Sequence, residues 1–250
     1  ATYGVDVAKM SQASAQLADA AAYLELHIEQ GPLLESIGLP LAAVLGTCGV
    51  ERHRVVWRGQ AAHAGSTPMD RRRDALAGAA RLALDIREIA REIGAGAVCT
   101  SGGVACQPGI ATSVVEVAEQ LIDQRHLDAE KLAQLLARAQ RLSWQIAAEE
   151  RLDVRWDLIY RIAPLAFHPE LIALAEAAIA QTCGTSYRMP SGPLHDASEM
   201  VRAGLPTVML FVQSLRGISH SKLEDTHEEH IGLAVQALAH LTDTTIAWIG

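Results

Sequence analysis

The order of strand and helix patterns between residues 50 and 167 constrains the fold of this 250-residue chain more than any other feature. Alternating or continuous apolar runs predict strands, whereas apolar residues at every third or fourth position predict helices. In chain order, the patterns are a strand at 50–59, a helix at 70–93, strands at 95–106 and 112–126, a helix at 127–150 and a strand at 151–164. This β-α-β-β-α-β order is typical of the ferredoxin-like split βαβ unit, so we predict an inserted α+β domain at 50–167.

The segments on either side of this domain have a different pattern. They alternate helices with strongly apolar strands, with helices predicted at 8–22, 169–182 and from about Thr226, and strands predicted at 23–30, 39–49 and 206–212. Helices that flank apolar strands favour an α/β sheet. We therefore predict that residues 1–49 and 168–250 form the first and last parts of one α/β domain.

Charge and cysteine content exclude several classes of function. Lys and Arg number 21 against 29 Asp and Glu, which gives a net charge of −8 and no electrostatic reason to bind nucleic acid or an anionic membrane. No apolar run reaches the roughly 18 to 20 residues of a membrane span. The four cysteines form no CxxC pair, which is typical of free thiols in a reducing compartment. We expect a cytoplasmic protein without nucleic-acid or membrane partners.

Ten histidines are the candidates for chemistry, and their settings differ. Small or polar turn residues flank four of them, which leaves the imidazoles accessible as ligands or bases: His27, His63, His195 and His220. Solvated or helix-capping positions are expected for another five, namely His53, His168, His227, His230 and His240, and a surface position is expected for His126. Taken singly, each of the four accessible histidines can also be structural, so the residues alone leave both roles open.

Four ordered segments closely resemble one enzyme family. They are YLELHIEQGPLLE (23–35), GQAAHAGSTPMDRRRDAL (59–76), SGPLHDASEM (191–200) and MLFVQSLRGISHSKLEDT (209–226). They resemble the amidase, hydantoinase and carbamoylase branch of the M20 metallopeptidase-like superfamily, which includes N-carbamoyl-L-amino-acid hydrolases, allantoate amidohydrolase and β-ureidopropionase. The resemblance implies a partial M20-type catalytic domain at 1–49 and 168–250, with 50–167 as a lid and dimerisation domain.

The resemblance also implies roles for individual residues. His27 and His220 correspond to ligands of a centre that holds two divalent ions, zinc or manganese. His63 corresponds to a catalytic histidine that donates a hydrogen bond to the developing oxyanion across a dimer interface. Substrate-binding roles fall on Gln30, Ser113, Arg125 and His195, of which Arg125 would hold the substrate carboxylate in a bidentate fork.

Several positions depart from the family pattern. The family centre also needs a histidine, a bridging aspartate, a glutamate and a glutamate base, which come from an N-terminal half that ordinarily precedes the segment beginning at Tyr23. Glu25 and Glu29 are not expected to replace them, on the expectation that they do not share the strand face of His27. Thr112 or Ser113 stands where the family has asparagine, and Pro193 and Leu194 replace a small Ala-Gly pair, which narrows or stiffens that loop.

Three functional hypotheses follow. The first is a hydrolase of linear C–N amide bonds, of the N-carbamoyl-amino-acid or ureido-acid type, whose two-metal site is completed by residues outside this chain. Its partners would be a small carboxylate substrate, a second copy of the chain and a separate N-terminal half. The alternative is a non-catalytic paralogue that dimerises or binds a small carboxylate. A third hypothesis, metal-independent catalysis by the histidines, has no specific support in the sequence.

Overall fold

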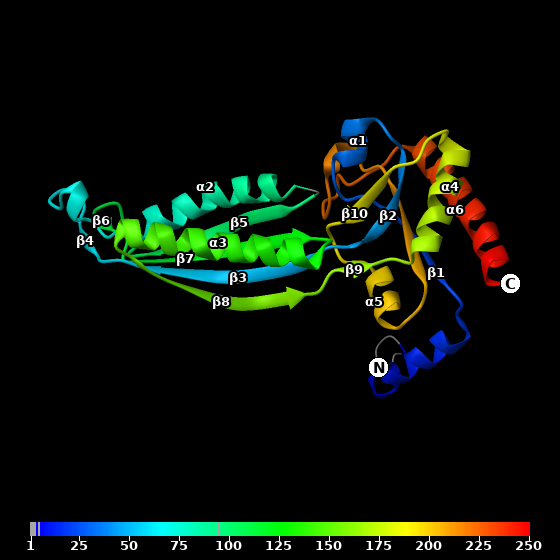
Figure 1. Cartoon of the computed structure of the whole chain (residues 1–250), viewed down its shortest axis with the longest axis horizontal. Coiled ribbons are helices and arrows are strands. Elements are labelled where there is room, and N and C mark those ends of the chain that lie inside the picture. The colour runs from blue at the N-terminus through cyan, green and yellow to red at the C-terminus, as the bar shows by residue number, and fades with distance from the viewer. Residues whose placement is uncertain (1–3, 5, 95) are drawn as a thin grey trace. The chain divides into compact units, whose positions relative to one another are not determined.

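The computed structural model describes residues 4, 6–94 and 96–250, and these form a mixed α/β structure (Figure 1). Residues 1–3, 5 and 95 lie outside the described part, and with them the start of the first predicted segment and the first residue of the strand predicted at 95–106. The chain divides into two compact units. The first unit comprises Ala1–Thr47 with Leu165–Gly250, and the second comprises Cys48–Pro164.

A mixed sheet forms the centre of the first unit. Its strands are β1 (Tyr23–Ile28), β2 (Leu41–Thr47), β9 (Leu165–Ala166), β10 (Arg188–Ser191) and β11 (Thr207–Val212). The order is β1-β11-β2-β10, with β9 paired to β2. β1 is parallel to β11 and β10 is parallel to β2, whereas β11 and β2 are antiparallel. Every residue of β11 is buried, as its continuous apolar sequence predicts for a central strand.

Among the described residues, three helices pack on this sheet: α4 (Pro169–Cys183), α5 (Asp196–Arg202) and α6 (Glu228–Ile249). The unit also contains α1 (Leu33–Ile37) in contact with η3 (Leu215–Gly217), and η1 (Val7–Asp19), whose described residues are almost all exposed. α4 and α6 pack side by side, and their buried residues join the strands in one apolar core (Figure 1). The segment predicted as a helix at 8–22 is a 3₁₀ helix that ends at Asp19. Within the described residues, no helix is long and apolar enough to cross a membrane.

The second unit is a four-stranded antiparallel sheet with two long helices on one face (Figure 1). Its strands are β3 (Gly49–Arg58), β5 (Val98–Gln107), β7 (Val117–His126) and β8 (Asp153–Ile162), in the order β5-β7-β3-β8. The helices are α2 (Ala75–Ile93) and α3 (Ala129–Glu150). A short ladder of β4 (Ala62–His63) with β6 (Ser113–Val114) and the turn η2 (Met69–Arg71) complete the unit.

Two boundaries in the second unit differ from the sequence prediction. The helix predicted from residue 70 begins at Ala75, because the Asp74 carboxylate accepts backbone N–H groups of the first turn and fixes the N-cap there. The strand predicted at 112–126 is two strands, β6 and β7, separated by Val115 and Glu116. Asp128 caps α3 in the same way as Asp74 caps α2.

Strand alternation builds the core of the second unit. On β7 the even-numbered residues from Ala118 to His126 are buried beneath the helices. Gln120 is fully buried among them, and its amide is satisfied: its Oε1 accepts the Trp57 indole N–H at 3.1 Å, and its Nε2 donates to the Ala79 carbonyl. A buried amide with all partners in place specifies how α2 lies on the sheet.

Two histidines contradict the sequence expectation of solvent-facing positions. His53 on β3 and His126 on β7 are only 4% and 3% exposed. Their charged sequence neighbours project from the other face of the strand, so local charge is a poor guide to burial there. His126 Nδ1 accepts the backbone N–H of Asp128 at 2.8 Å. His168 and His227 stand at the N-caps of α4 and α6, but neither side chain makes a capping hydrogen bond.

The four cysteines are free thiols, as the sequence predicts. Burial raises the pKa of Cys48 to about 11 and that of Cys99 to about 12. Cys106 and Cys183 are partly buried, and burial raises their thiol pKa values as well. None of the four is therefore an activated thiolate of the kind that nucleophilic catalysis requires.

The alternation on β7 can be tested with two neighbouring residues. Ile122 is fully buried beneath the helices, and Leu121 is 46% exposed on the opposite face. We expect Ile122→Ala to lower the free energy of unfolding by about 2 to 5 kcal/mol, because it leaves a cavity in a close-packed core. Leu121→Ala is the matched control and should cost less than about 1 kcal/mol. Urea unfolding followed by tryptophan fluorescence measures both, and equal losses would contradict the assigned faces.

Candidate functional site

A polar cavity of about 400 Å³ lies in the first unit. Its lining comes from β1, from Gln30 shortly after it, from the loop between β10 and α5 with the first residue of α5, and from the loop that precedes α6. The lining residues are Glu25, His27, Gln30, Pro193, Leu194, His195, Asp196 and His220. Four residues that the sequence analysis assigned to the site, His27, Gln30, His195 and His220, therefore surround one cavity. Leu194 is exposed and lines it, so the departure from the family's small residue bears directly on the cavity wall.

The expectation that Glu25 and Glu29 stand apart from His27 is wrong for Glu25. Residues two apart on a strand share a face, and Glu25 lines the same cavity as His27. Glu29 lies beyond the end of β1, and its carboxylate accepts the backbone N–H groups of Leu33 and Leu34 at 2.7 and 2.9 Å. Glu29 thus caps α1 and is unavailable to the cavity.

The imidazole rings of His27 and His195, which both line the cavity, are in contact with each other. Their ring centroids are 4.5 Å apart at an interplanar angle of 67°. His195 is 9% exposed, and burial together with the neighbouring His27 lowers the pKa of His195 to about 4. Its Nε2 lies 2.7 Å from the Ser191 hydroxyl, and its Nδ1 lies 3.8 Å from Glu25 Oε1. His195 is therefore a neutral imidazole at physiological pH.

Ser191, His195 and Glu25 are neighbours in space and have the residue types of a serine-hydrolase triad. Unlike the serine of such a triad, however, Ser191 is not accessible to a substrate. Ser191 is fully buried, and its hydroxyl also lies 2.8 Å from the Pro193 carbonyl, to which it donates. A nucleophile must reach the substrate. The serine therefore orients His195 instead of attacking a substrate.

Glu25, His27 and His195 form a group that could hold a metal ion. One ligand atom from each residue lies within 4.8 Å of the others. Two imidazoles and a carboxylate are the donor types that zinc and related transition metals prefer. Within the described residues this is the one such group of three.

Gln30 and His220 are held by the loops around the cavity. Both have positive φ angles, 57° and 56°, which non-glycine residues adopt rarely. The Gln30 backbone N–H donates to Ser214 Oγ, and its side-chain amide donates to Ser219 Oγ at 3.0 Å. The His220 backbone N–H donates to Glu224. The loop before α6 is thus tied to the end of β1 by Gln30, which brings His220 to the cavity.

The second unit brings His63 and Ser113 together. They are directly opposite each other in the ladder of β4 with β6. His63 Nδ1 accepts the backbone N–H groups of Gly65 and Ser66, at 3.1 and 3.2 Å. Because Nδ1 accepts, the neutral ring carries its proton on Nε2. The exposed His63 side chain therefore presents an N–H donor.

Arg125, the expected carboxylate fork, contacts a carboxylate of its own unit. Its Nε donates to Asp123 at 2.7 Å, and Arg52 bonds the same carboxylate. Burial raises the pKa of Asp123, but the hydrogen bonds from the two guanidinium groups outweigh it and hold that pKa below its usual value. Asp123 thus fixes the position of Arg125 as an orienting partner.

Sequence reasoning set aside one residue that shapes these sites, Glu25, and missed another, Arg72. Glu25 had a signal, since it stands two positions before His27 on an alternating strand. Arg72 had none: its guanidinium reaches back to donate to the carbonyls of Ala64 and Thr67, at 2.6 and 3.1 Å. It holds the loop that carries His63.

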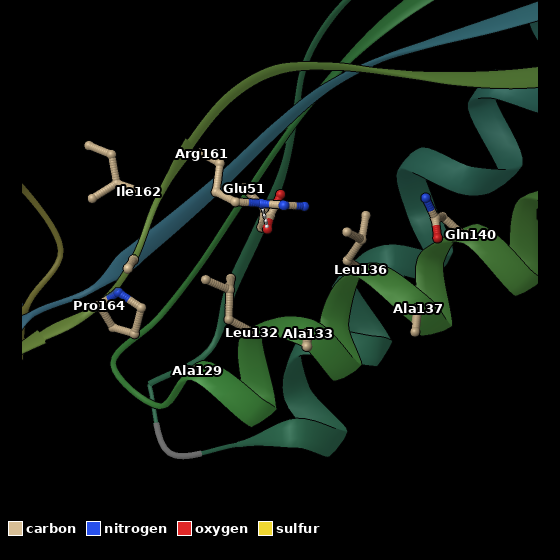
Figure 2. A pocket seen from close by; sticks show the side chains of 11 residues that line it. Glu51, Ala129, Leu132, Ala133, Leu136, Ala137, Gln140, Arg161, Ile162 and Pro164 are labelled. Carbon is tan, nitrogen blue, oxygen red and sulfur yellow. Dashed lines mark hydrogen bonds and ion pairs between the residues drawn. The ribbon is translucent and has the colours of Figure 1, made fainter.

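A second cavity, of about 420 Å³, lies between α3 and the end of β8 in the second unit (Figure 2). Its lining is mostly aliphatic, with Leu132 and Leu136 on α3 facing the Glu51–Arg161 ion pair on the sheet. Arg161 Nε donates to Glu51 at 2.5 Å, so the charges of this pair are already matched. This lining lacks the histidine pair that distinguishes the cavity in the first unit.

Comparisons with known proteins agree on one family. The model of the family described as "Peptidase family M20/M25/M40" matches residues 5–244. An N-carbamoyl-L-amino acid amidohydrolase of Geobacillus stearothermophilus is 34% identical over 95% of this chain and 58% of its own length. An allantoate amidohydrolase of Escherichia coli is 33% identical over 92% of this chain and 56% of its own length.

Solved structures give the same picture. A crystal structure described as an amidase of the hydantoinase/carbamoylase family, from Burkholderia multivorans, superposes with a TM-score of 0.83 at 34% identity. The superposed region covers 88% of this chain and 53% of the chain in that crystal structure. The mixed α/β fold of this chain thus matches the corresponding part of this solved amidase. The chain spans a little over half the length of the curated relatives it matches.

The clamp on the His63 loop can be tested with adjacent arginines. Arg72→Ala removes two charge-assisted hydrogen bonds to the loop carbonyls. We expect the backbone order parameters of Gly65 and Ser66, measured by ¹⁵N relaxation, to fall from about 0.85 to below about 0.6. The control is Arg71→Ala, because Arg71 is largely exposed and pairs with its neighbour Asp70. A loop that stays rigid in Arg72→Ala would show that Arg72 does not hold it.

Proposed function

Because this chain belongs to the M20/M25/M40 peptidase family, we propose that it is part of a metal-dependent hydrolase of linear C–N amide bonds. The substrates would be N-carbamoyl amino acids or other ureido acids. The observation that carries this proposal is the single cavity shared by His27, Gln30, His195 and His220. The names of the relatives support the substrate class, since they act on N-carbamoyl-L-amino acids and on allantoate.

In this proposal His27 and His220 are ligands of a centre with two divalent ions, zinc or manganese. Such ions polarise the scissile carbonyl and lower the pKa of bound water. Imidazole nitrogens suit these metals, and both side chains line the cavity. Gln30 and His195 then orient the substrate beside them. The ordered Gln30 amide and the neutral His195 ring favour binding of a polar, uncharged carbamoyl group.

His63, Ser113 and Arg125 have roles in the second unit. His63 would donate its Nε2–H to the oxyanion that develops on the carbonyl, a role favoured by the hydrogen bonds that its Nδ1 accepts. Ser113, across the ladder from His63, would contact the substrate. Arg125 would bind the substrate carboxylate, with Asp123 holding the guanidinium in place.

The second unit would serve as a ferredoxin-like lid and homodimerisation domain, and the protein would act in the cytoplasm. The remaining metal ligands and the general base would come from a polypeptide segment outside this chain. The alternative is a paralogue that dimerises or binds a small carboxylate without catalysis. The retained polar lining of the cavity, with both histidines of the expected metal pair, favours the hydrolase.

Hydrolysis should require the remaining ligands. We expect the purified chain with Mn²⁺ or Zn²⁺ to release little ammonia from N-carbamoyl-L-amino acids, because water activation needs a complete centre and a base. Adding the portion of the Geobacillus relative that the match with this chain leaves uncovered should raise the rate. The matched control repeats the mixture with His63→Ala, for which we expect a loss of about 10²- to 10³-fold in kcat.

The hydrolase and the non-catalytic paralogue predict different outcomes in this assay. An assembled, metal-loaded mixture that remains inactive would favour the non-catalytic paralogue. Ordinary turnover by the chain alone would contradict the need for outside ligands and would place the missing carboxylates among its own residues.

The homodimer has its own measurement. We expect the chain to be a dimer at micromolar concentration by light scattering, because edge strand β8 exposes Leu158, Ile159 and Tyr160, which a partner could cover. Replacing Leu158 and Ile159 by lysine should then give monomers with an unchanged circular dichroism spectrum. A wild-type monomer under these conditions would contradict the dimer.

A further inference from the structure

We propose that Glu25, His27 and His195 form a preorganised three-ligand site for one zinc-like divalent ion, built entirely from this chain. This ligand set differs from the pair His27 and His220 that the family resemblance implies, and it assigns His195 to the metal ion, where the proposed function assigns it to the substrate. It goes beyond the proposed hydrolysis because it concerns metal binding alone. All three residues belong to the first unit. Glu25 and His27 come from β1, and His195 precedes the first turn of α5.

The ligand atoms are close enough together that small movements of the side chains would let them bind one metal ion. The three atoms lie within 4.8 Å of one another, and Glu25 Oε1 is 3.8 Å from His195 Nδ1. Bonds of about 2.0 to 2.1 Å in a tetrahedron place ligand atoms roughly 3.4 Å apart. Movements on the order of 1 Å, within reach of side-chain rotation, therefore close the site.

Hydrogen bonds give His27 the tautomer that a ligand needs. His27 Nδ1 lies 2.8 Å from the Ile28 carbonyl oxygen, which can only accept, so Nδ1 carries the proton. The Nε2 lone pair is then available to a metal. A ligating histidine that donates its other N–H to a backbone carbonyl is the usual outer-shell arrangement at protein metal sites.

His195 is oriented in the complementary way. The Ser191 hydroxyl donates to the Pro193 carbonyl, and so it accepts the His195 Nε2–H at 2.7 Å. This leaves the Nδ1 lone pair on the side of Glu25. The second carboxylate oxygen of Glu25 accepts the Ala197 backbone N–H at 2.8 Å, and Oε1 remains on the side of His195. Each of the three side chains is thus oriented by hydrogen bonds within the protein, and His195 Nδ1 lies on the side of Glu25 Oε1.

Charge and donor type define the ion. The group offers one carboxylate oxygen and two imidazole nitrogens, and its three side chains are partly buried, so a divalent cation would gain a negatively charged ligand in a site of limited solvent access. Two nitrogen donors favour zinc, cobalt or nickel over magnesium and calcium, which prefer all-oxygen sites. Because the group lines an open cavity, a fourth position faces solvent, as in zinc sites that keep a water ligand.

Cobalt provides a direct test on the 250-residue chain. Titration with Co²⁺ should give the intense visible absorption of four- or five-coordinate cobalt, saturating at one ion per chain, and calorimetry with Zn²⁺ should give the same stoichiometry. We expect Glu25→Gln and His195→Ala each to weaken binding at least tenfold. Glu25→Gln preserves an acceptor for Ala197, so its loss of affinity reports ligation. Ser191→Ala should weaken binding less, by removing only the group that orients His195.

Two further variants make the result decisive. His240→Ala, on α6 and outside the cavity lining, is the control for a lost histidine and should bind as the unmodified chain does. His220→Ala distinguishes the ligand sets: we expect its affinity for the first ion to stay within about threefold of the unmodified chain. Loss of binding in His220→Ala with retention in Glu25→Gln would overturn the proposal, and so would the absence of saturable binding. Circular dichroism confirms that each variant is folded.

These measurements do not depend on hydrolysis. Saturable cobalt binding that needs Glu25 and His195 supports the site even when the completed mixture is inactive, and that inactivity counts against the proposed hydrolase. Conversely, the mixture could be active while Glu25→Gln and His195→Ala leave the metal affinity unchanged. That result would overturn the three-ligand site and support the proposed hydrolase.

Discussion

The parallel pairing of β1 with β11 is the contact on which the first unit depends. It joins Tyr23–Ile28 to Thr207–Val212, with His27 opposite Phe211. The loop that follows β11 is thereby carried to the end of β1, where the Gln30 backbone and side chain bond Ser214 and Ser219. α5 completes the arrangement, because its Ala197 N–H bonds Glu25 on β1. A cavity with polar lining from three distant segments follows from this one strand pairing.

Backbone groups decide which imidazole nitrogen carries a proton in both units. The Ile28 carbonyl places the proton of His27 on Nδ1, whereas two loop N–H groups place that of His63 on Nε2. The same residue type is thus prepared as a metal ligand in one unit and as a hydrogen-bond donor in the other. Both preparations are local, since each uses backbone groups within three residues of the histidine, so short motifs such as HIEQG and HAGST carry them.

The two units differ in whether their carboxylates are paired with cationic side chains of the same unit. In the first, His27, His195 and Glu25 meet, and among the described residues no lysine or arginine forms an ion pair with Glu25, which makes the group a candidate for an ion. In the second, Glu51 is matched by Arg161, and Asp123 by Arg52 and Arg125. An internally neutralised pair offers little to a charged ligand, whereas an unmatched carboxylate between two imidazoles offers an electrostatic well.

The sequence by itself determined most of the elements and selected four residues that line one cavity. Periodicity located β1, β3, α3 and β11 within a few residues, and the ordered motifs picked out His27, Gln30, His195 and His220 before any contact was known. Tertiary structure alone decided the rest. The burial of His53 and His126 depended on which strand face the helices cover, and the contacts of His195 and Ala197 with His27 and Glu25 depended on how α5 lies against β1. Such outcomes are set by partners far along the chain, and a local pattern of charges and apolar residues does not record them.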